Sequence, residues 1–188
     1  RQGQRVLVIG ASGGVGSYAV QLAVAHGAVV TGVSSAAKAD LVRQLGARHV
    51  VAYDREALDA EGVAYDLVVS TGGLAPVRAL RRLLTPTGTL VIVGAEGGGS
   101  ITGGIGRQLR AMLWSPFVKQ RLTALVAREH HDVIDRLATH LADGSVVPAI
   151  SRTVGLDEVP ATLGALEAGE VRGKAVVSVA AVPDRTAD

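Results

Sequence analysis

The sequence predicts an α/β fold with a parallel, doubly wound sheet, and three observations lead to this prediction. Residues 6–9 form a wholly apolar run rich in β-branched residues, which is typical of a strand buried on both faces. Glycines at 10, 13, 14 and 16 follow, and apolar residues then recur at helical spacing as far as Gly27. Further apolar runs alternate with helical segments, which favours parallel strands covered by helices.

The elements of the first half follow from these patterns. Val15, Ala19, Leu22 and Ala23 mark the expected apolar face of the first helix. The other expected strands are residues 28–33, 49–52, 66–69 and 89–93, the expected helices are 35–45 and 76–84, residues 54–60 form a polar helix or turn, and residues 85–88 form a turn. Right-handed crossovers then predict the strand order 3-2-1-4-5-6, counting a sixth strand further on.

The second half begins with a change in composition. Residues 95–106 contain six glycines and few large apolar side chains, which predicts a mobile loop. A helix at 107–113, the sixth strand at 121–126, an amphipathic helix at 132–141, an extended stretch at 146–154, a helix at 156–168 and a strand at 174–179 are expected after it. Pro148 argues against a central strand in the extended stretch, and the tail from Pro183 is polar.

Composition excludes several classes of protein. The chain has 188 residues, 48% of them hydrophobic, and a formal net charge of +2, which is too small to indicate a nucleic-acid partner. Cysteine is absent, which excludes disulfides and thiolate metal sites and is compatible with the cytoplasmic location that we expect. No run approaches the roughly 20 apolar residues of a membrane span, and no signal peptide precedes the first strand. Because the chain starts without Met, we expect a piece of a larger polypeptide.

The glycine-rich turn has the arrangement of a pyrophosphate-binding site. Ala11, Gly13 and Gly16 stand in the register of a G-x-G-x-x-G pattern, with alanine at its first position and Gly10 just ahead. Glycines let the backbone approach the ligand, while a helix N-terminus offers free N–H groups and the positive end of a dipole. The alternative is a turn that packs a helix onto a strand without any ligand.

The end of the second strand predicts which dinucleotide is bound. NAD-binding folds place an acid there to accept hydrogen bonds from the ribose 2′-hydroxyl, but residues 32–35 contain none, and the next acid is Asp40. Ser35 and Lys38 instead suit a 2′-phosphate. The sequence therefore favours NADP(H) over NAD(H). The alternative is that Ser35 only caps a helix and Lys38 is a solvated charge.

Several segments together resemble the nucleotide-binding portion of the medium-chain dehydrogenase/reductase superfamily, in its quinone-oxidoreductase-like, zinc-free branch. The segments that carry the resemblance are residues 8–16, 35–38, 45–47, 50–53, 65–69, 88–94 and 172–177. They follow the family's order across residues 3–180. The turn at residues 70–73 departs from the family pattern, because relatives often carry an Asp before Val-Gly-Gly.

The resemblance implies a set of cofactor-binding residues. Residues 13–16 would carry the pyrophosphate with Val15 packed beneath it, the strand tips would surround the 2′-phosphate, and later turns would border the nicotinamide. The complete set is Ala11, Ser12, Gly13, Gly14, Val15, Gly16, Ser34, Ser35, Lys38, Tyr53, Ser70, Thr71, Gly72, Val93, Gly94 and Ala95. The cofactor implied is NADPH, with NADH less favoured, and no metal is expected in this chain.

The resemblance also implies a domain organisation and partners. Residues 1–145 would form the Rossmann domain, and residues 146–188 would pack on an N-terminal GroES-like catalytic domain that this sequence does not contain. Catalytic residues therefore stay unassigned. The implied partners are a small-molecule substrate, that catalytic domain and a second copy in a homodimer, with neither nucleic acid nor membrane.

The function that follows is the NADPH-binding part of an oxidoreductase that transfers hydride to a quinone, enone or other activated double bond, and the piece alone would be inert. A zinc-type alcohol dehydrogenase, a polyketide-synthase enoyl reductase and a non-catalytic NADPH-binding module remain as alternatives. A Ser-His-Asp hydrolase is weighed because Ser12 lies in a G-x-S-x-G pattern at a strand-to-helix turn, but no spacing selects its partners.

Other residues are weighed as structural or surface features. The adjacent His130 and His131 would point about 100° apart on a helix, so a shared metal is not expected. Lys119 and Asp132 are interpreted as surface charges. A bulky apolar cluster is interpreted as core, a substrate-side wall or a subunit contact; its members are Leu109, Met112, Leu113, Trp114 and Phe117.

Overall fold

The computed structural model describes residues 2–59, 62–73, 75–94, 111, 114–115, 118–125 and 130–179. The chain divides into two compact units, residues 1–147 and 148–188. The expected glycine loop, nearly all of the helix expected at 107–113 and the tail from Pro183 lie outside the described residues, as do four of the five bulky cluster residues.

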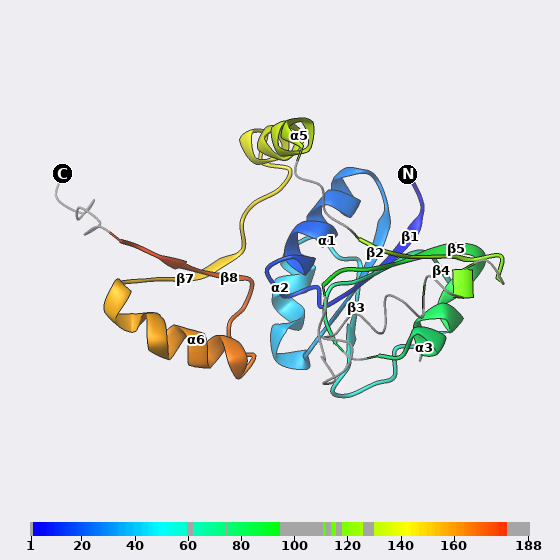
Figure 1. Ribbon diagram of the computed structural model, residues 1–188, viewed down its shortest axis with the longest axis horizontal. Coiled ribbons are helices and arrows are strands. Elements are labelled where there is room, and N and C mark those ends of the chain that lie inside the picture. The colour runs from blue at the N-terminus through cyan, green and yellow to red at the C-terminus, as the bar shows by residue number, and fades with distance from the viewer. Residues whose placement is uncertain are drawn as a thin grey trace. The chain divides into compact units, whose positions relative to one another are not determined.

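The first unit is built on one parallel sheet of six strands (Figure 1). Its strands are β1 (Arg5–Ile9), β2 (Val29–Ser34), β3 (His49–Ala52), β4 (Tyr65–Ser70), β5 (Leu84–Ile92) and β6 (Arg121–Ala124). Their order is β3-β2-β1-β4-β5-β6, and every neighbouring pair is parallel. The predicted fold class and strand order are confirmed.

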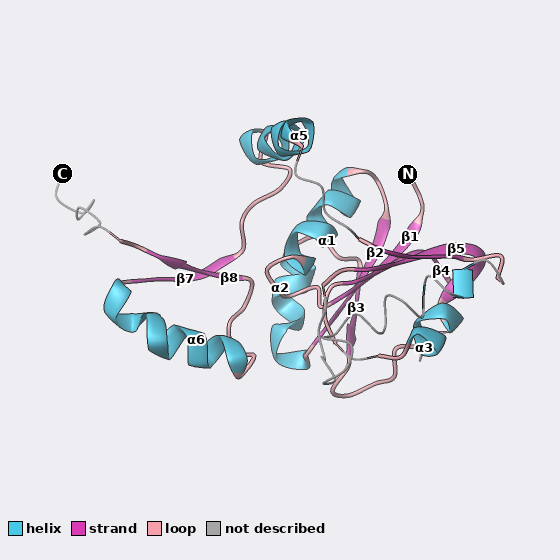
Figure 2. Ribbon diagram, viewed as in Figure 1, coloured by secondary structure: helices cyan, strands magenta, loops and turns pink. Residues whose placement is uncertain are grey.

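Helices cover both faces of this sheet, as a doubly wound fold requires (Figure 2). Helices α1 (Gly16–Ala25) and α2 (Ala39–Gln44), the latter preceded by the 3-10 turn η1 (Ala36–Lys38), pack on one face and α3 (Val77–Arg82) packs on the other, whereas α5 (His131–Ala142) has no buried residue. Val6 and Val8 belong to a buried cluster with residues of α1 and α2, whereas Leu7 and Ile9 belong to another cluster with residues of α3. Because successive strand residues point to opposite faces, β1 separates the two cores.

The face that α1 buries agrees with the prediction only in part: Ala19 and Ala23 pack against the core as expected, but Val15 does not. Its fully buried positions are Gly16, Ser17, Val20 and Gln21, whereas Val15 is 58% exposed. Gly16 packs directly against the turn after β1, where a Cβ would overlap the Gly10 carbonyl oxygen, and this contact sets the rotation of the helix. Apolar spacing alone therefore did not predict the polar and glycine positions that this helix also buries.

Strand β5 begins earlier than predicted. Tyr65 pairs with Leu84 and Leu67 pairs with Thr89, so residues 85–88 form an irregularity inside the strand rather than a turn before it. A Cβ on Gly88 would lie 2.8 Å from the carbonyl oxygen of Tyr65. Gly88 therefore allows the backbone of β5 to lie close to that of β4.

The second unit contains β7 (Ile150–Val154), the 3-10 turn η3 (Leu156–Glu158), α6 (Val159–Glu167) and β8 (Lys174–Val177). Strands β7 and β8 form a parallel two-stranded sheet of their own, so the extended stretch after Pro148 is not a strand of the central sheet. Among the described residues of both units, no helix is long and apolar enough to cross a membrane.

Candidate dinucleotide site

The predicted site residues lie at or after the carboxyl ends of five parallel strands, β1 to β5, at one edge of the sheet. Ile9 of β1 pairs with Val33 of β2 and with Ser70 of β4, and Ser70 pairs with Ile92 of β5. All of these strands are parallel, so their carboxyl ends lie at the same edge. The chain leaves β1 toward β2 on one side and reaches β4 on the other, and such a switch point is where open α/β sheets bind ligands.

The segment from residue 10 to residue 17, here called the glycine turn, is tied to the sheet by its backbone. The N–H groups of Gly10 and Ala11 donate to the carbonyl oxygen of Val33 at 3.1 and 3.0 Å. Gly13 N–H donates back to the Gly10 carbonyl at 3.0 Å. Gly10 has a φ of +80°, a conformation that L side chains rarely adopt. Ala11 is fully buried, so alanine at the first fingerprint position serves the core.

Gly16 brings the start of α1 against the turn. A Cβ at this position would overlap the carbonyl oxygen of Gly10, so no larger residue fits without moving the backbone. Ser17 N–H donates to the Gly13 carbonyl at 3.0 Å. Within the described part of the chain, no hydrogen bond is donated by the backbone of Gly14, Val15 or Gly16. These amides at the N-terminus of a ten-residue helix suit an anion.

Thr71 joins the turn after β4 to the glycine turn. Its hydroxyl donates to the Ile9 carbonyl at 2.8 Å, and its own N–H donates to the same oxygen at 3.0 Å. A Cβ on Gly10 would lie 2.8 Å from the Thr71 hydroxyl oxygen. The threonine that departs from the family pattern therefore has a structural role here, and Gly72 follows it.

The ends of β4 and β5 carry the remaining predicted residues at this edge of the sheet. Ser70 is 2% exposed, and its carbonyl accepts the N–H of Val93 at 2.8 Å. Gly94 follows with a φ of +82° and nothing within 4 Å of where a Cβ would stand. Ala95 lies outside the described residues.

A second group, here called the strand tip, consists of residues 34–38 and 53–54. Ser34 is 2% exposed and its hydroxyl donates to the Ser35 carbonyl at 3.0 Å, while Tyr53 N–H donates to the Ser34 carbonyl at 3.1 Å. Ser35 precedes η1 in extended conformation but makes no side-chain cap, so the expected capping role is wrong. Lys38 ends η1, and Tyr53 is 62% exposed.

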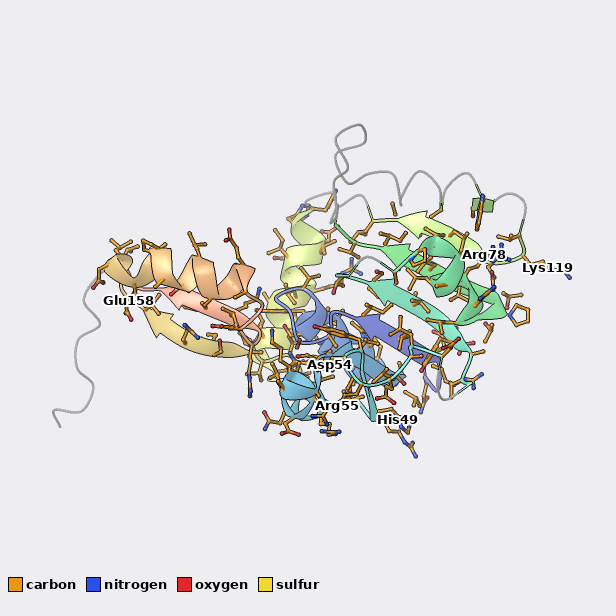
Figure 3. All side chains as sticks on the ribbon, turned by 90° about the horizontal axis from the view of Figure 1, so that it is seen from below. His49, Asp54, Arg55, Arg78, Lys119 and Glu158 are labelled. Atoms are coloured by element: carbon orange, nitrogen blue, oxygen red, sulfur yellow. The ribbon has the colours of Figure 1, made fainter. Side chains whose placement is uncertain are left out.

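Asp54 is the strand-tip residue that the sequence pattern missed. Its Oδ1 accepts the backbone N–H of Ala36 at 2.9 Å, which is the hydrogen bond that a cap of η1 would make. Asp54 and Arg55 follow the carboxyl end of β3, whereas His49 begins that strand (Figure 3). The sequence pattern expects an acid at the end of β2, but β3 is the neighbour of β2 in the sheet, and the end of β3 supplies the carboxylate. The predicted strand order could have revealed this carboxylate.

The geometry expected of His130 and His131 is wrong, although both lie at the surface as interpreted. The rings of His130 and His131 stack with centroids 5.0 Å apart, and both engage Asp132, with His131 Nε2 at 2.8 Å and His130 Nδ1 at 3.5 Å. One ligand atom from each of the three residues lies within 4.8 Å of the others. The 100° spacing does not apply because His130 precedes α5 with an extended backbone, φ −129° and ψ 133°. All three side chains are exposed.

The other residues weighed from the sequence do not gain a catalytic role. Ser12 is only 7% exposed, which does not suit a nucleophile that must meet a substrate. Trp114 is 40% exposed, and the Arg81 guanidinium carbon lies over its ring, 5.7 Å from the ring centroid. Lys119 and Asp132 are exposed, as expected of surface charges (Figure 3 for Lys119).

Several known proteins have sequences similar to this chain. Residues 45–177 match the family model described as zinc-binding dehydrogenase. A mitochondrial NAD(P)H oxidoreductase of Mus musculus is 33% identical over 95% of this chain and 48% of its own length. An NAD-dependent alcohol dehydrogenase of Sulfolobus acidocaldarius is 32% identical over 93% of this chain and 50% of its own length.

A solved structure has a similar fold. The quinone oxidoreductase from Coxiella burnetii superposes with a TM-score of 0.80 at 27% identity, covering 96% of this chain and 54% of that one. The chain thus spans about half the length of the relatives that it matches.

Proposed function

This chain belongs to the zinc-binding dehydrogenase family, in the quinone-oxidoreductase-like part of the medium-chain dehydrogenase/reductase superfamily, and we propose that it is the NADP(H)-binding portion of an oxidoreductase. The acceptor proposed is a quinone, enone or other activated double bond. One observation carries the proposal: the glycine turn, the strand tip and the turns after β4 and β5 share one sheet edge.

The glycine turn is proposed to bind the pyrophosphate. The amides of Gly14, Val15 and Gly16 donate to no group in the described part of the chain, and the α1 dipole favours an anion beside them. Val15 is exposed at this point, so its side chain is available to contact the cofactor rather than the core. The close contact of Gly16 with the Gly10 carbonyl holds the start of the helix against the turn.

The strand tip is proposed to bind the adenosine ribose and its 2′-phosphate. Lys38 would supply a positive charge, and Ser34, Ser35 and Tyr53 would supply polar groups around it. Relatives named for NAD(P)H and for NAD support a nicotinamide dinucleotide, and the choice of NADPH rests on these side chains.

The turns after β4 and β5 are proposed to border the nicotinamide, which supplies the hydride when it is bound. Ser70, Thr71 and Gly72 would lie along the cofactor, and Val93, Gly94 and Ala95 would flank its ring. Thr71 holds the β4 turn to β1, so this chain orients the cofactor through a rigid backbone. The groups that polarise the acceptor would come from an N-terminal catalytic domain.

The remaining parts of the proposal concern organisation. Residues 1–145 are proposed to be the cofactor domain, and residues 146–188 to contact the catalytic domain; two copies are proposed to pair. The quinone oxidoreductase among the similar structures supports the acceptor class. The NAD-dependent alcohol dehydrogenase favours a dehydrogenase acting on alcohols as the second candidate.

A titration tests the proposal. Calorimetry of the purified chain with NADPH and with NADH should give saturable binding of one dinucleotide per chain, tighter for NADPH. Turnover of a quinone or enone by a longer form containing a catalytic domain would then distinguish a reductase from a non-catalytic NADPH-binding module. Oxidation of alcohols with NAD⁺ in the same assay would favour the second candidate instead.

A further inference from the structure

We propose that Asp54 limits the preference of this site for NADPH over NADH and is therefore a specificity-determining residue. The inference rests on the proposed function, because it assumes that the strand tip receives the adenosine ribose. Residues 32–35, at the end of β2, include no acid. The carboxylate does stand at the strand tip, but β3 supplies it rather than β2.

The position of Asp54 is fixed by a short network of hydrogen bonds. On one side, Tyr53 N–H donates to the Ser34 carbonyl at 3.1 Å and continues the pairing of β3 with β2. On the other side, the Glu56 carboxylate accepts the N–H of Ala52 at 2.9 Å, and Arg55 N–H donates to the Ala52 carbonyl at 2.9 Å. The turn that carries Asp54 is therefore held at both ends.

The Asp54 carboxylate occupies a backbone donor that an anion would use. Its Oδ1 accepts the Ala36 N–H at 2.9 Å, in the turn between Ser35 and Lys38. The ion pairs found among the described residues do not include Asp54, so no guanidinium or ammonium in an ion pair neutralises it there. Arg55 is the cation next to it in the sequence, and Glu56 adds a further negative charge to its turn.

The two cofactors differ in how they would respond to this carboxylate. The ribose 2′-hydroxyl of NADH is a donor that a carboxylate can accept, whereas the 2′-phosphate of NADPH is an acceptor with up to two negative charges. Repulsion between like charges a few ångströms apart at a solvated surface lowers binding severalfold and weakens with salt. Asp54 therefore disfavours NADPH and leaves NADH unaffected or better bound.

Asp54→Asn isolates the charge, because the asparagine amide oxygen can still accept the Ala36 N–H. We expect this variant to bind NADPH about fivefold more tightly at low salt, with the gain shrinking at high salt, while its affinity for NADH changes by less than about twofold. Calorimetric titrations with NADPH and NADH at two ionic strengths measure both effects, and circular dichroism confirms that the variant is folded.

Asp66→Asn is the matched control. Asp66 Oδ2 also accepts a backbone N–H, that of Arg5 at 2.9 Å, but it lies where β1 and β4 begin, at the opposite edge of the sheet. This variant should leave both affinities unchanged. An equal gain for NADPH in Asp66→Asn, or equal changes for NADPH and NADH in Asp54→Asn, overturns the proposal.

A second variant separates the charge from the hydrogen bond. Asp54→Ala removes both, so it should shift selectivity in the same direction as Asp54→Asn. If only the alanine variant shifts it, loss of the Ala36 hydrogen bond is the cause, and the proposal is wrong. A wild-type chain that binds neither dinucleotide contradicts the proposed function itself, whereas binding with an unchanged ratio in Asp54→Asn contradicts only the role of Asp54.

Discussion

The glycine turn and the strand tip lie at the ends of adjacent strands, but different forces hold them. The turn is fixed by backbone contacts: Gly10 and Ala11 bond to Val33, and Gly16 meets the Gly10 carbonyl. The tip is held largely by polar side chains of two strands, among them Asp54 on the Ala36 amide. Its charged residues are accessible to solvent, whereas the base of the turn is buried.

This difference predicts how each region responds to mutation. In the turn, steric contact with backbone leaves almost no freedom, so changes there should alter stability and binding together. At the tip, side chains can be exchanged without disturbing the core, so changes should alter which dinucleotide is preferred and leave folding intact. Substitutions in the glycine turn and at the strand tip test this distinction.

Gly16→Ala should have the largest effect. The added methyl group overlaps the Gly10 carbonyl, and the start of α1 must shift. We expect a loss of about 3 kcal/mol in the free energy of unfolding, together with loss of measurable dinucleotide binding. Urea denaturation and calorimetric titration measure the two consequences.

Gly164→Ala provides the control for this substitution. Gly164 lies within α6, and nothing stands within 4 Å of where its Cβ would be. Alanine should stabilise that helix by about 0.5–1 kcal/mol and leave binding unchanged. A stable, binding-competent Gly16→Ala chain would show that the turn is less constrained than its contacts indicate.

Lys38→Ala should have an intermediate effect confined to one cofactor. Loss of a charge-assisted contact should weaken NADPH binding about tenfold, while NADH affinity and the free energy of unfolding stay nearly the same. Fluorescence titration with both nucleotides measures the ratio. Equal weakening of NADPH and NADH would mean that Lys38 does not contact the 2′-phosphate.

Thr71→Val should have the smallest effect. The isosteric change removes the hydroxyl that donates to the Ile9 carbonyl but keeps the side-chain volume and the backbone hydrogen bond to the same oxygen. We expect a loss of about 1 kcal/mol in stability. Urea denaturation measures it, and a loss as large as that of Gly16→Ala would contradict the secondary role of this contact.

The sequence predicted the turn better than the tip for a physical reason. A buried strand, glycines and a helix are local features, and the close contact of Gly16 with Gly10 joins residues near each other in the chain. The strand order was also predictable, because alternating strands and right-handed crossovers leave few topologies. The Asp54 contact joins residues 18 positions apart, so a search along one segment could not find it.

Two other differences from the prediction have separate origins, one in strand pairing and one in the backbone at the start of a helix. The start of β5 depends on its pairing with Tyr65, and the turn residues 85–88 are absorbed inside the strand. The stacking of His130 on His131 depends on where α5 begins, since His130 keeps an extended backbone. In the first case pairing with another strand overrides local turn propensity, and in the second the backbone before the helix sets the ring geometry.

The central claim is that the backbone amides of the glycine turn bind a dinucleotide while the strand tip contacts its 2′-substituent. Amide chemical shifts recorded during NADPH titration of the ¹⁵N-labelled chain test it most directly. The account predicts saturable shifts at Gly14, Val15, Gly16 and residues 35–38, the latter set changing when NADH replaces NADPH. Saturable binding that leaves the glycine turn unshifted would contradict it.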